Sequence, residues 1–280
     1  MVWIRKKGPK VAAFIFLFIM TLIWILPVLY AVLSSFKSNV EINSMGYKLL
    51  PEQWIVDNYV KVLTNFDNAP ILRWFLNSLL ISVTQTILVL VVSSSAAYAY
   101  SRLKFKGRDA IFWILLSTMM FPSVINLIPL YKIVSMFNWV DTPLAVIVPG
   151  VAGVFNIFLI KQFMVSIPKE YDESARIEGA SDFQIYTKVI LPLIRPVLTV
   201  VGLFTFTGAW NDFLWPSIVF NNIENLPLTP ALQLFQGMYT TDYGRLTTSA
   251  VIAIIPTFIL YLFTQKYFLE GLNLSSGIKG

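Results

Sequence analysis

The stretch 11–33, VAAFIFLFIMTLIWILPVLYAVL, contains no charged residue. As an α-helix with a rise of about 1.5 Å per residue, it would extend about 34 Å, whereas the hydrocarbon core of a bilayer is about 30 Å thick. Four basic residues precede it, but the apolar run is too long for the hydrophobic part of a signal peptide, and no small-residue cleavage site follows. We therefore expect 11–33 to be a transmembrane span.

Five further apolar stretches have a similar length, and short polar loops separate them: 75–100, 110–131, 143–164, 196–220 and 247–269. The whole chain of 280 residues is 56% hydrophobic and 13% charged, while soluble domains carry about 25% charged residues. The sequence predicts an all-α polytopic membrane protein with six transmembrane helices, forming a single domain over 1–280. The polar segment 34–74 is too hydrophilic to cross, and its part 58–66 is expected to form one short helix on the outer surface.

The distribution of Lys and Arg predicts the orientation. With the N-terminus inside, 15 of the 21 basic residues fall in inner segments and six in outer ones. The acidic residues divide evenly between the two sides, so only the basic residues carry the bias that marks the cytoplasmic face. Both termini are therefore expected to be cytoplasmic.

The sequence lacks the residues that several kinds of chemistry require. The chain has no Cys and no His, which removes thiol nucleophiles, imidazole metal ligands and histidine proton relays. Neither a G-x-x-x-x-G-K-[ST] phosphate loop nor a G-x-S-x-G nucleophile elbow occurs. Asp212 is the only carboxylate within the predicted spans. We expect no enzyme activity, catalytic residue, metal or cofactor in this chain.

The cytoplasmic connection 166–196, SIPKEYDESARIEGASDFQIYTKVILPLIRP, is more organised than a simple connector requires. Acidic residues follow Pro168 and favour the N-terminal end of a helix, which should run to Glu178. Gly179 suits the left-handed position that ends a helix, and Ser181 with Gln184 fits a capping box for a second helix. Pro192 and Pro196 should then bend the chain into the fifth span. Small or apolar residues near the turn (Ala175, Ile177, Ala180) would leave a smooth docking surface. The alternative is an amphipathic connector whose acids balance nearby bases.

At these residues the chain resembles a known family. The pattern is E-S-A-R-I-E-G, followed by nine residues and then V-I-L-P. It is similar to the EAA signature of permease subunits in ATP-binding-cassette (ABC) importers, with Ser174 in place of the usual second alanine. In that family the loop is a coupling helix that docks in a cleft of a separate ATPase subunit. The resemblance assigns ATPase coupling to Glu173, Ser174, Ala175, Glu178, Gly179, Ala180, Leu191 and Pro192.

Other stretches resemble the carbohydrate-uptake branch, and among its proteins the shorter, maltose-type permease subunit: 77–79, 121–122, 127–131, 158–159, 210–216 and the tail 277–280. This resemblance implies the type I ABC importer permease fold, a place in the cell membrane of a prokaryote and a sugar cargo, expected to be an oligosaccharide or a related polyol. The implied partners are a second six-span permease, two ATPase subunits that hold ATP and Mg²⁺, and an external sugar-binding protein. The tail 275–280 is a candidate second contact with the ATPases.

Polar residues in the spans are candidates for the substrate path: Asn126, Asn156, Asn211 and Asp212. A lone charge in a span usually faces protein or water, because it costs at least about 2.5 kcal/mol at the bilayer centre. As an alternative to lining the path, Asp212 could lie near the outer membrane interface, where Trp210 and Trp215 on either side would belong to an aromatic belt. The asparagines, like Gln85, have the alternative of bonding to neighbouring helices.

Three other functions remain open. A permease of the same class could carry glycerol phosphate or another polar solute, for which Lys161, near the inner end of its predicted span, is the only hint. A stand-alone secondary transporter would need no ATPase, but it usually shows several intramembrane acids or histidines. A structural scaffold has no positive support.

Overall fold

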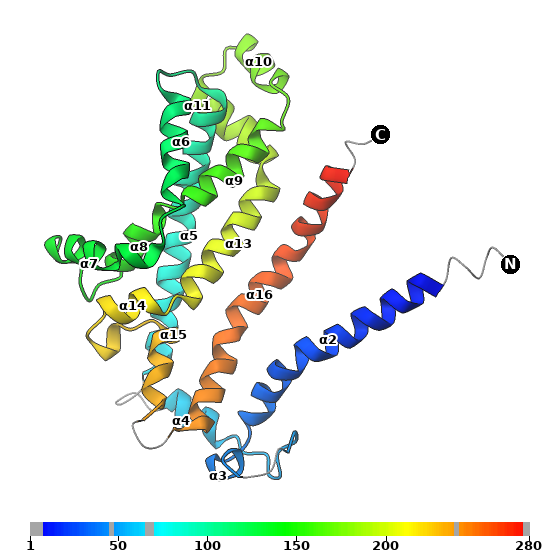
Figure 1. Cartoon of the computed structure of the whole chain (residues 1–280), viewed down its shortest axis with the longest axis vertical. Helices are drawn as coiled ribbons and strands as arrows, with labels where there is room; N and C mark the ends of the chain where they lie inside the picture. Colours follow the sequence, from blue (N-terminus) through cyan, green and yellow to red (C-terminus); the bar gives the residue numbers. More distant parts are fainter. Residues whose placement is uncertain (1–7, 45–47, 65–69, 238–240, 277–280) are drawn as a thin grey trace. The chain divides into compact units, whose positions relative to one another are not determined.

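The computed structural model describes residues 8–44, 48–64, 70–237 and 241–276 (Figure 1). Within these ranges the chain forms helices and no strand, apart from one isolated bridge between Gln236 and Thr241. The all-α prediction is confirmed. The tail residues 277–280, part of the predicted second ATPase contact, lie outside the described residues.

The chain divides into two compact units, which are considered separately. Unit 1 comprises Met1–Ile71 and Leu232–Ile255, and unit 2 comprises Leu72–Ala231 and Pro256–Gly280. Helix α16, Tyr243–Ser276, contributes to both. The single domain expected from the sequence stays a prediction.

Unit 1 contains the first span and the segment that follows it. Its helices are α2 (Gly8–Ser34), α3 (Asn39–Ile42), α4 (Asp57–Thr64), η4 (Leu232–Phe235) and the first part of α16. No residue in the apolar window of α2 is buried, and Trp24 is 78% exposed. A helix that is apolar all round needs an apolar environment, which for α2 must come from lipid or from another protein.

Helix α4 corresponds to the short helix expected at 58–66, of which residues 65 and 66 lie outside the described ranges. Its buried Asn58 donates from Nδ2 to the carbonyls of Ser35 and Lys37, at 2.9 and 2.8 Å. The hydroxyl of Tyr59 lies 2.8 Å from that of Ser35. These bonds attach α4 to the turn that follows α2, where buried carbonyls would otherwise lack donors.

Unit 2 holds the middle spans. Its α-helices of eight or more residues are α5 (Ile71–Arg102), α6 (Arg108–Thr118), α7 (Leu127–Met136), α8 (Leu144–Val151), α9 (Val154–Val165), α10 (Glu170–Ile177) and α13 (Arg195–Asn211). Shorter elements are η1 (Ser123–Asn126), α11 (Asp182–Gln184), the π-helix η2 (Ile185–Ile190), α12 (Leu191–Leu193), α14 (Leu214–Val219), η3 (Ile223–Asn225) and α15 (Leu228–Ala231).

In the described part of the chain, four helices are long and apolar enough to cross a membrane, and two bent pairs raise the number to six if each counts as one span. The predicted spans 110–131, 143–164 and 196–220 are not continuous helices. The third bends by 93° between Thr118 and Ser123, where Pro122 is extended and begins η1. The fourth is interrupted at Ala152, and α13 of the fifth ends before the extended Asp212. Proline explains the first break, because its ring removes a helical hydrogen bond.

The breaks divide unit 2 into two layers. Helices α6 and α13 both pack against α9, whereas α7 and α8 both pack against α14 (Figure 1). One hydrophobic cluster, around Ile160 and Ile185, belongs to the layer of α9 and α13. A second, around Val146 and Val219, belongs to the layer of α8 and α14.

Trp210 and Trp215 do not form an aromatic belt, so that interpretation is wrong. Both indoles are buried in unit 2. The indole N–H of Trp215 donates to the carbonyl of Ala145 at 2.9 Å, and Trp210 stacks on Phe206 with ring centroids 5.7 Å apart. Interface anchors need a wet side for their polar tip, whereas these two residues fill the core beside a helix break.

Candidate functional site

The loop between α9 and α13 begins as predicted. Helix α10 has three acidic residues in its first turn, near the positive end of its dipole. At its end, Ala180 N–H donates to the Ala175 carbonyl and Gly179 N–H to the Arg176 carbonyl, both at 3.0 Å. This is a Schellman motif, and Gly179 occupies its left-handed position with φ +83°. The two alanines are the positions where such a motif places its hydrophobic contact.

The second half of the loop also follows the predicted signals. Ser181 and Gln184 form a capping box, in which Ser181 N–H donates to Oε1 of Gln184 at 2.8 Å and Gln184 N–H to Oγ of Ser181 at 3.3 Å. The chain then winds through η2 and α12. A bend of 79° between Leu193 and Arg195 leads into α13, with a proline close on each side. The capping predictions are confirmed.

The loop exposes one set of the predicted residues and turns the other inward. Glu173, Ser174, Glu178, Gly179 and Pro192 are exposed. In contrast, three residues are partly buried against the core cluster: Ala175, Ala180 and Leu191. Of the three residues expected to form a smooth docking surface, Ile177 is exposed, whereas Ala175 and Ala180 are turned towards the core.

Two large apolar side chains dominate that outward surface. Ile177 is 87% exposed and Phe183 is 73% exposed, and Tyr171 is exposed as well. Acidic side chains (Glu173, Glu178) accompany them on the same loop. An exposed apolar group with a polar rim is typical of a site that another protein covers.

Sequence reasoning missed the residues that hold this loop. Ser94, Tyr98 and Arg102 follow one another at intervals of four on α5, and all three are buried or nearly so. The Arg102 guanidinium pairs with Asp172 of α10, and the Ser94 hydroxyl lies 2.7 Å from that of Tyr186 in η2. The spacing of four residues was a readable signal, but Arg102 counted only as a basic residue at the end of a span.

The four candidate path residues are not brought together by hydrogen bonds within the described ranges. Asn126 is exposed at the end of η1, and Asn156 lies against Gly153 in the first turn of α9. Asn211 donates to the carbonyl of Thr207 at 2.9 Å, and the backbone amides of the following turn lie against the Asp212 carboxylate. All four stand at or next to one of the three helix breaks. Their role in binding stays a prediction.

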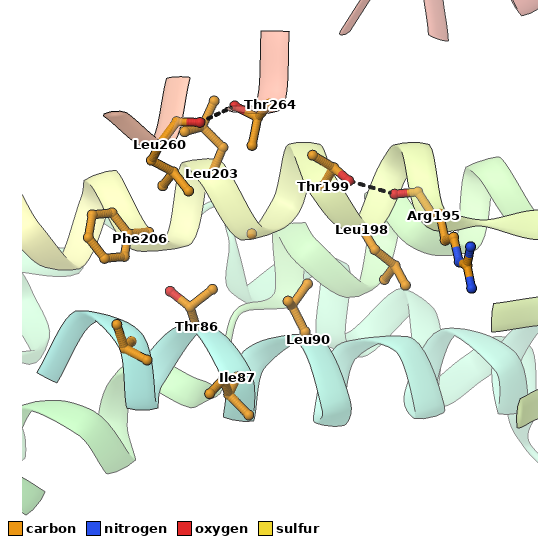
Figure 2. A pocket seen from close by; sticks show the side chains of 12 residues that line it. Thr86, Ile87, Leu90, Arg195, Leu198, Thr199, Leu203, Phe206, Leu260 and Thr264 are labelled. Carbon is orange, nitrogen blue, oxygen red and sulfur yellow. Dashed lines mark hydrogen bonds between the residues drawn. The ribbon is translucent and has the colours of Figure 1, made fainter. Parts of the chain in front are cut away.

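A groove of about 410 Å³ lies between α5, α13 and the second part of α16 (Figure 2). Its three threonine hydroxyls donate to carbonyls of their own helices: Thr86 to Ser82, Thr199 to Arg195 and Thr264 to Leu260. Most of the remaining lining is aliphatic or aromatic. The threonine hydroxyls are therefore engaged within their own helices, and Arg195 is the one charged residue of an otherwise mostly apolar lining.

The comparisons with known proteins agree with this geometry. Residues 89–272 match the family described as binding-protein-dependent transport system inner membrane component. The chain is 33% identical to the arabinooligosaccharides transport system permease protein AraQ of Halalkalibacterium halodurans, over 99% of this chain and 96% of that protein. It is 32% identical to the diacetylchitobiose uptake system permease protein NgcG of Streptomyces coelicolor, over 89% and 83%.

A solved structure is similar along almost the whole chain. It is the crystal structure of a bacterial ABC transporter involved in the import of the acidic polysaccharide alginate, with a TM-score of 0.82 and 25% identity. The match covers 94% of this chain and 98% of that one. The chain belongs to the family of binding-protein-dependent transport system inner membrane components, as a membrane-embedded permease of an ABC transporter.

Proposed function

We propose that this chain is one permease subunit of an ATP-driven, binding-protein-dependent importer for sugars, with an oligosaccharide as its cargo. The observation that carries the proposal is the loop of α10–α12, whose Schellman motif ends at the glycine of the family signature and whose capping box lies in the nine residues between the two parts of that signature. The related permeases named for arabinooligosaccharides and diacetylchitobiose support a carbohydrate cargo.

The ATPase would dock on the exposed side of the loop. Ile177 and Phe183 would enter an apolar cleft, while Glu173 and Glu178 at its edge would face polar or basic groups. ATP and Mg²⁺ would be held by two ATPase subunits, with none bound by this chain. For nucleotide to drive transport, the ATPase must hold the loop differently in its two states, because equal affinity for both would shift nothing.

The cargo would pass near the helix breaks. Broken helices leave backbone groups without partners, and transporters commonly use such points near the middle of the membrane for substrate binding. Asn126, Asn156, Asn211 and Asp212 are proposed as polar lining beside those breaks. A second six-span permease would supply the other wall, and an external binding protein would deliver the sugar. Both termini of this chain would lie in the cytoplasm.

The structure gives a phosphorylated cargo no added support. Lys161 was its only hint, and its ammonium lies 4.0 Å from the centre of the Phe112 ring. That contact is a cation–π interaction within unit 2, between α9 and α6.

Purification of the chain in mild detergent tests the proposal, with an affinity tag inserted after Ser44 and the C-terminus left free. We expect one copy each of two permeases and two copies of an ATPase. Uptake in a strain lacking the chromosomal gene, complemented with the tagged one, should then be measured for arabino-, chito- and malto-oligosaccharides and for glycerol 3-phosphate. A folded chain that comes alone and moves solute along an ion gradient would contradict the proposal. Uptake of the phosphate ester alone would contradict the sugar assignment.

A further inference from the structure

Arg102 is buried although it carries a full charge. Its side chain is 5% exposed, and a buried arginine is costly unless its donors are engaged. Its Nη2 donates to the carbonyls of Met164 and Ile167, at 3.1 and 2.8 Å. Its Nε lies 3.1 Å from Oδ2 of Asp172, an ion pair in which Nε forms no hydrogen bond among the described residues. One guanidinium therefore joins the end of α5, the end of α9 and the coupling helix α10.

Asp172 depends on this contact. Its side chain is 9% exposed, and among the described residues its Oδ1 has no hydrogen-bond partner. Burial raises the pKa of Asp172, and the neighbouring Arg102 guanidinium acts in the opposite direction. Removing either partner would leave an unpaired charge in a buried place.

A second contact on the same face of α5 holds the other half of the loop. The Tyr186 hydroxyl lies 2.7 Å from that of Ser94, and its ring centroid lies 5.2 Å from that of Tyr98. The loop is thus attached to one row of α5 at two points. By comparison, Arg176 pairs with Asp182 inside the loop, where both side chains are about half exposed.

We propose that Arg102 is a positioning residue that fixes α10 to the ends of α5 and α9. When the ATPase displaces the coupling loop, α5 and α9 then move with it. Without this contact, the backbone between α9 and α10, around Ile167, could bend and absorb the displacement. The inference deepens the proposed function and rests on it, because it assigns to named atoms the link between the ATPase-docking loop and the membrane part.

The experiment compares Arg102→Gln with the control Arg176→Gln, which removes the same charge from the exposed pair. Hydrogen exchange of the amides of α10 is measured by mass spectrometry, on the full chain in lipid nanodiscs with whatever subunits co-purify. We expect exchange at least tenfold faster for Arg102→Gln and less than twofold faster for the control. Arg102→Lys should restore part of the protection, because one ammonium can pair with Asp172 but cannot also reach both carbonyls.

A second measurement reports the link itself. The chain has no cysteine, so spin labels can be placed at cysteines introduced for Glu170 on α10 and Val91 on α5, both exposed. In the otherwise unaltered chain the distance between them should stay the same, with a narrow spread, when MgATP and vanadate are added. In Arg102→Gln the spread should widen and the distance should change with nucleotide. Equal spreads and equal exchange in Arg102→Gln and Arg176→Gln would overturn the proposal.

If Arg102→Gln does not insert, Asp172→Asn takes its place, because it keeps both bonds from Arg102 to the carbonyls. It should show the same faster exchange, and unchanged exchange would overturn the proposal. Failure of the proposed function gives a different result. In that case no ATPase accompanies the unaltered chain and nucleotide changes nothing, while the exchange comparison still decides whether Arg102 holds α10.

Discussion

Substitutions at Gly179 can separate two contributions to stability: the strain of its left-handed backbone conformation and the space that a side chain needs. Its φ of +83° lies in the left-handed region, and a Cβ built on it would meet no atom of the described residues within 4 Å, apart from its two neighbours in the chain. An L-residue in that region costs about 1–2 kcal/mol from its own backbone sterics. Gly179→Ala should therefore destabilise the Schellman turn by about that amount, and Gly179→Asn by less, because asparagine tolerates the left-handed region better.

A loss of this size raises the equilibrium constant for opening of the turn about 5- to 30-fold. Hydrogen exchange of the peptide containing α10 and Gly179 should accelerate by that factor in Gly179→Ala, measured on the full chain in nanodiscs. Gly107 provides a matched control, since its φ is +81° and the nearest atom to its Cβ would be 3.7 Å away, but it is the N-cap of α6 and lies outside the coupling loop. Gly107→Ala should have a similar local cost without affecting the coupling loop.

A bulky residue then tests the docking surface. Because the space beside Gly179 is open in this chain, Gly179→Trp should cost the isolated chain no more than Gly179→Ala. Any additional loss of bound ATPase in Gly179→Trp must come from the partner. Equal ATPase recovery with Trp and Ala at this position, or equal loss of uptake in Gly107→Ala, would refute the assignment of Gly179 to the docked surface.

Three other substitutions test packing, each by thermal unfolding of the purified chain against the unaltered protein. Trp215→Phe should cost about 1–3 kcal/mol, because it leaves the Ala145 carbonyl without its donor; an unchanged transition would contradict the contact. Asn58→Ala removes two buried hydrogen bonds and should cost about 2 kcal/mol; a loss as small as that of an exposed polar residue would speak against them. Gly150→Ala would place a Cβ 2.3 Å from Nε2 of Gln85, so it should cost about 1 kcal/mol. That cost should largely disappear in a Gln85→Ala background, and additive losses would show that the two side chains do not meet.

Local signals in the sequence predicted the coupling loop well. Gly179, and Ser181 with Gln184, act over three or four residues, and their bonds form within the loop itself. A Schellman turn or a capping box needs no distant partner, so the sequence contains nearly all the information about it. The orientation of Ala175 and Ala180 depended on what lies beneath the loop, and that part of the prediction did not hold.

The helix breaks were harder to predict because hydropathy does not register them. The stretch 196–220 is apolar enough on average to be identified as a span, and this average does not register the extended backbone at Asp212. What the break changes is the direction of the backbone, which allows α14 to pack under α8 and bury Trp215. Pro122 could have indicated the break in the third span, since proline disfavours a helical conformation at the preceding residue. At Ala152 the flanking Pro149, Gly150 and Gly153 were a similar signal.

Arg102 illustrates why a charge count cannot find a positioning residue. The positive-inside bias records only on which side of the membrane a basic residue lies, and a side chain that reaches into water satisfies it as well as one that turns inward. Arg102 turns inward because the end of α9 and the turn that follows it each offer it a carbonyl, and α10 brings Asp172 within reach. Arg176 has an acidic partner too, yet it stays half exposed because no such carbonyls accompany that partner. The burial of a basic residue at a span end is therefore decided by the acceptors that the next loop presents, and a long-range contact of this kind is visible only in the folded chain.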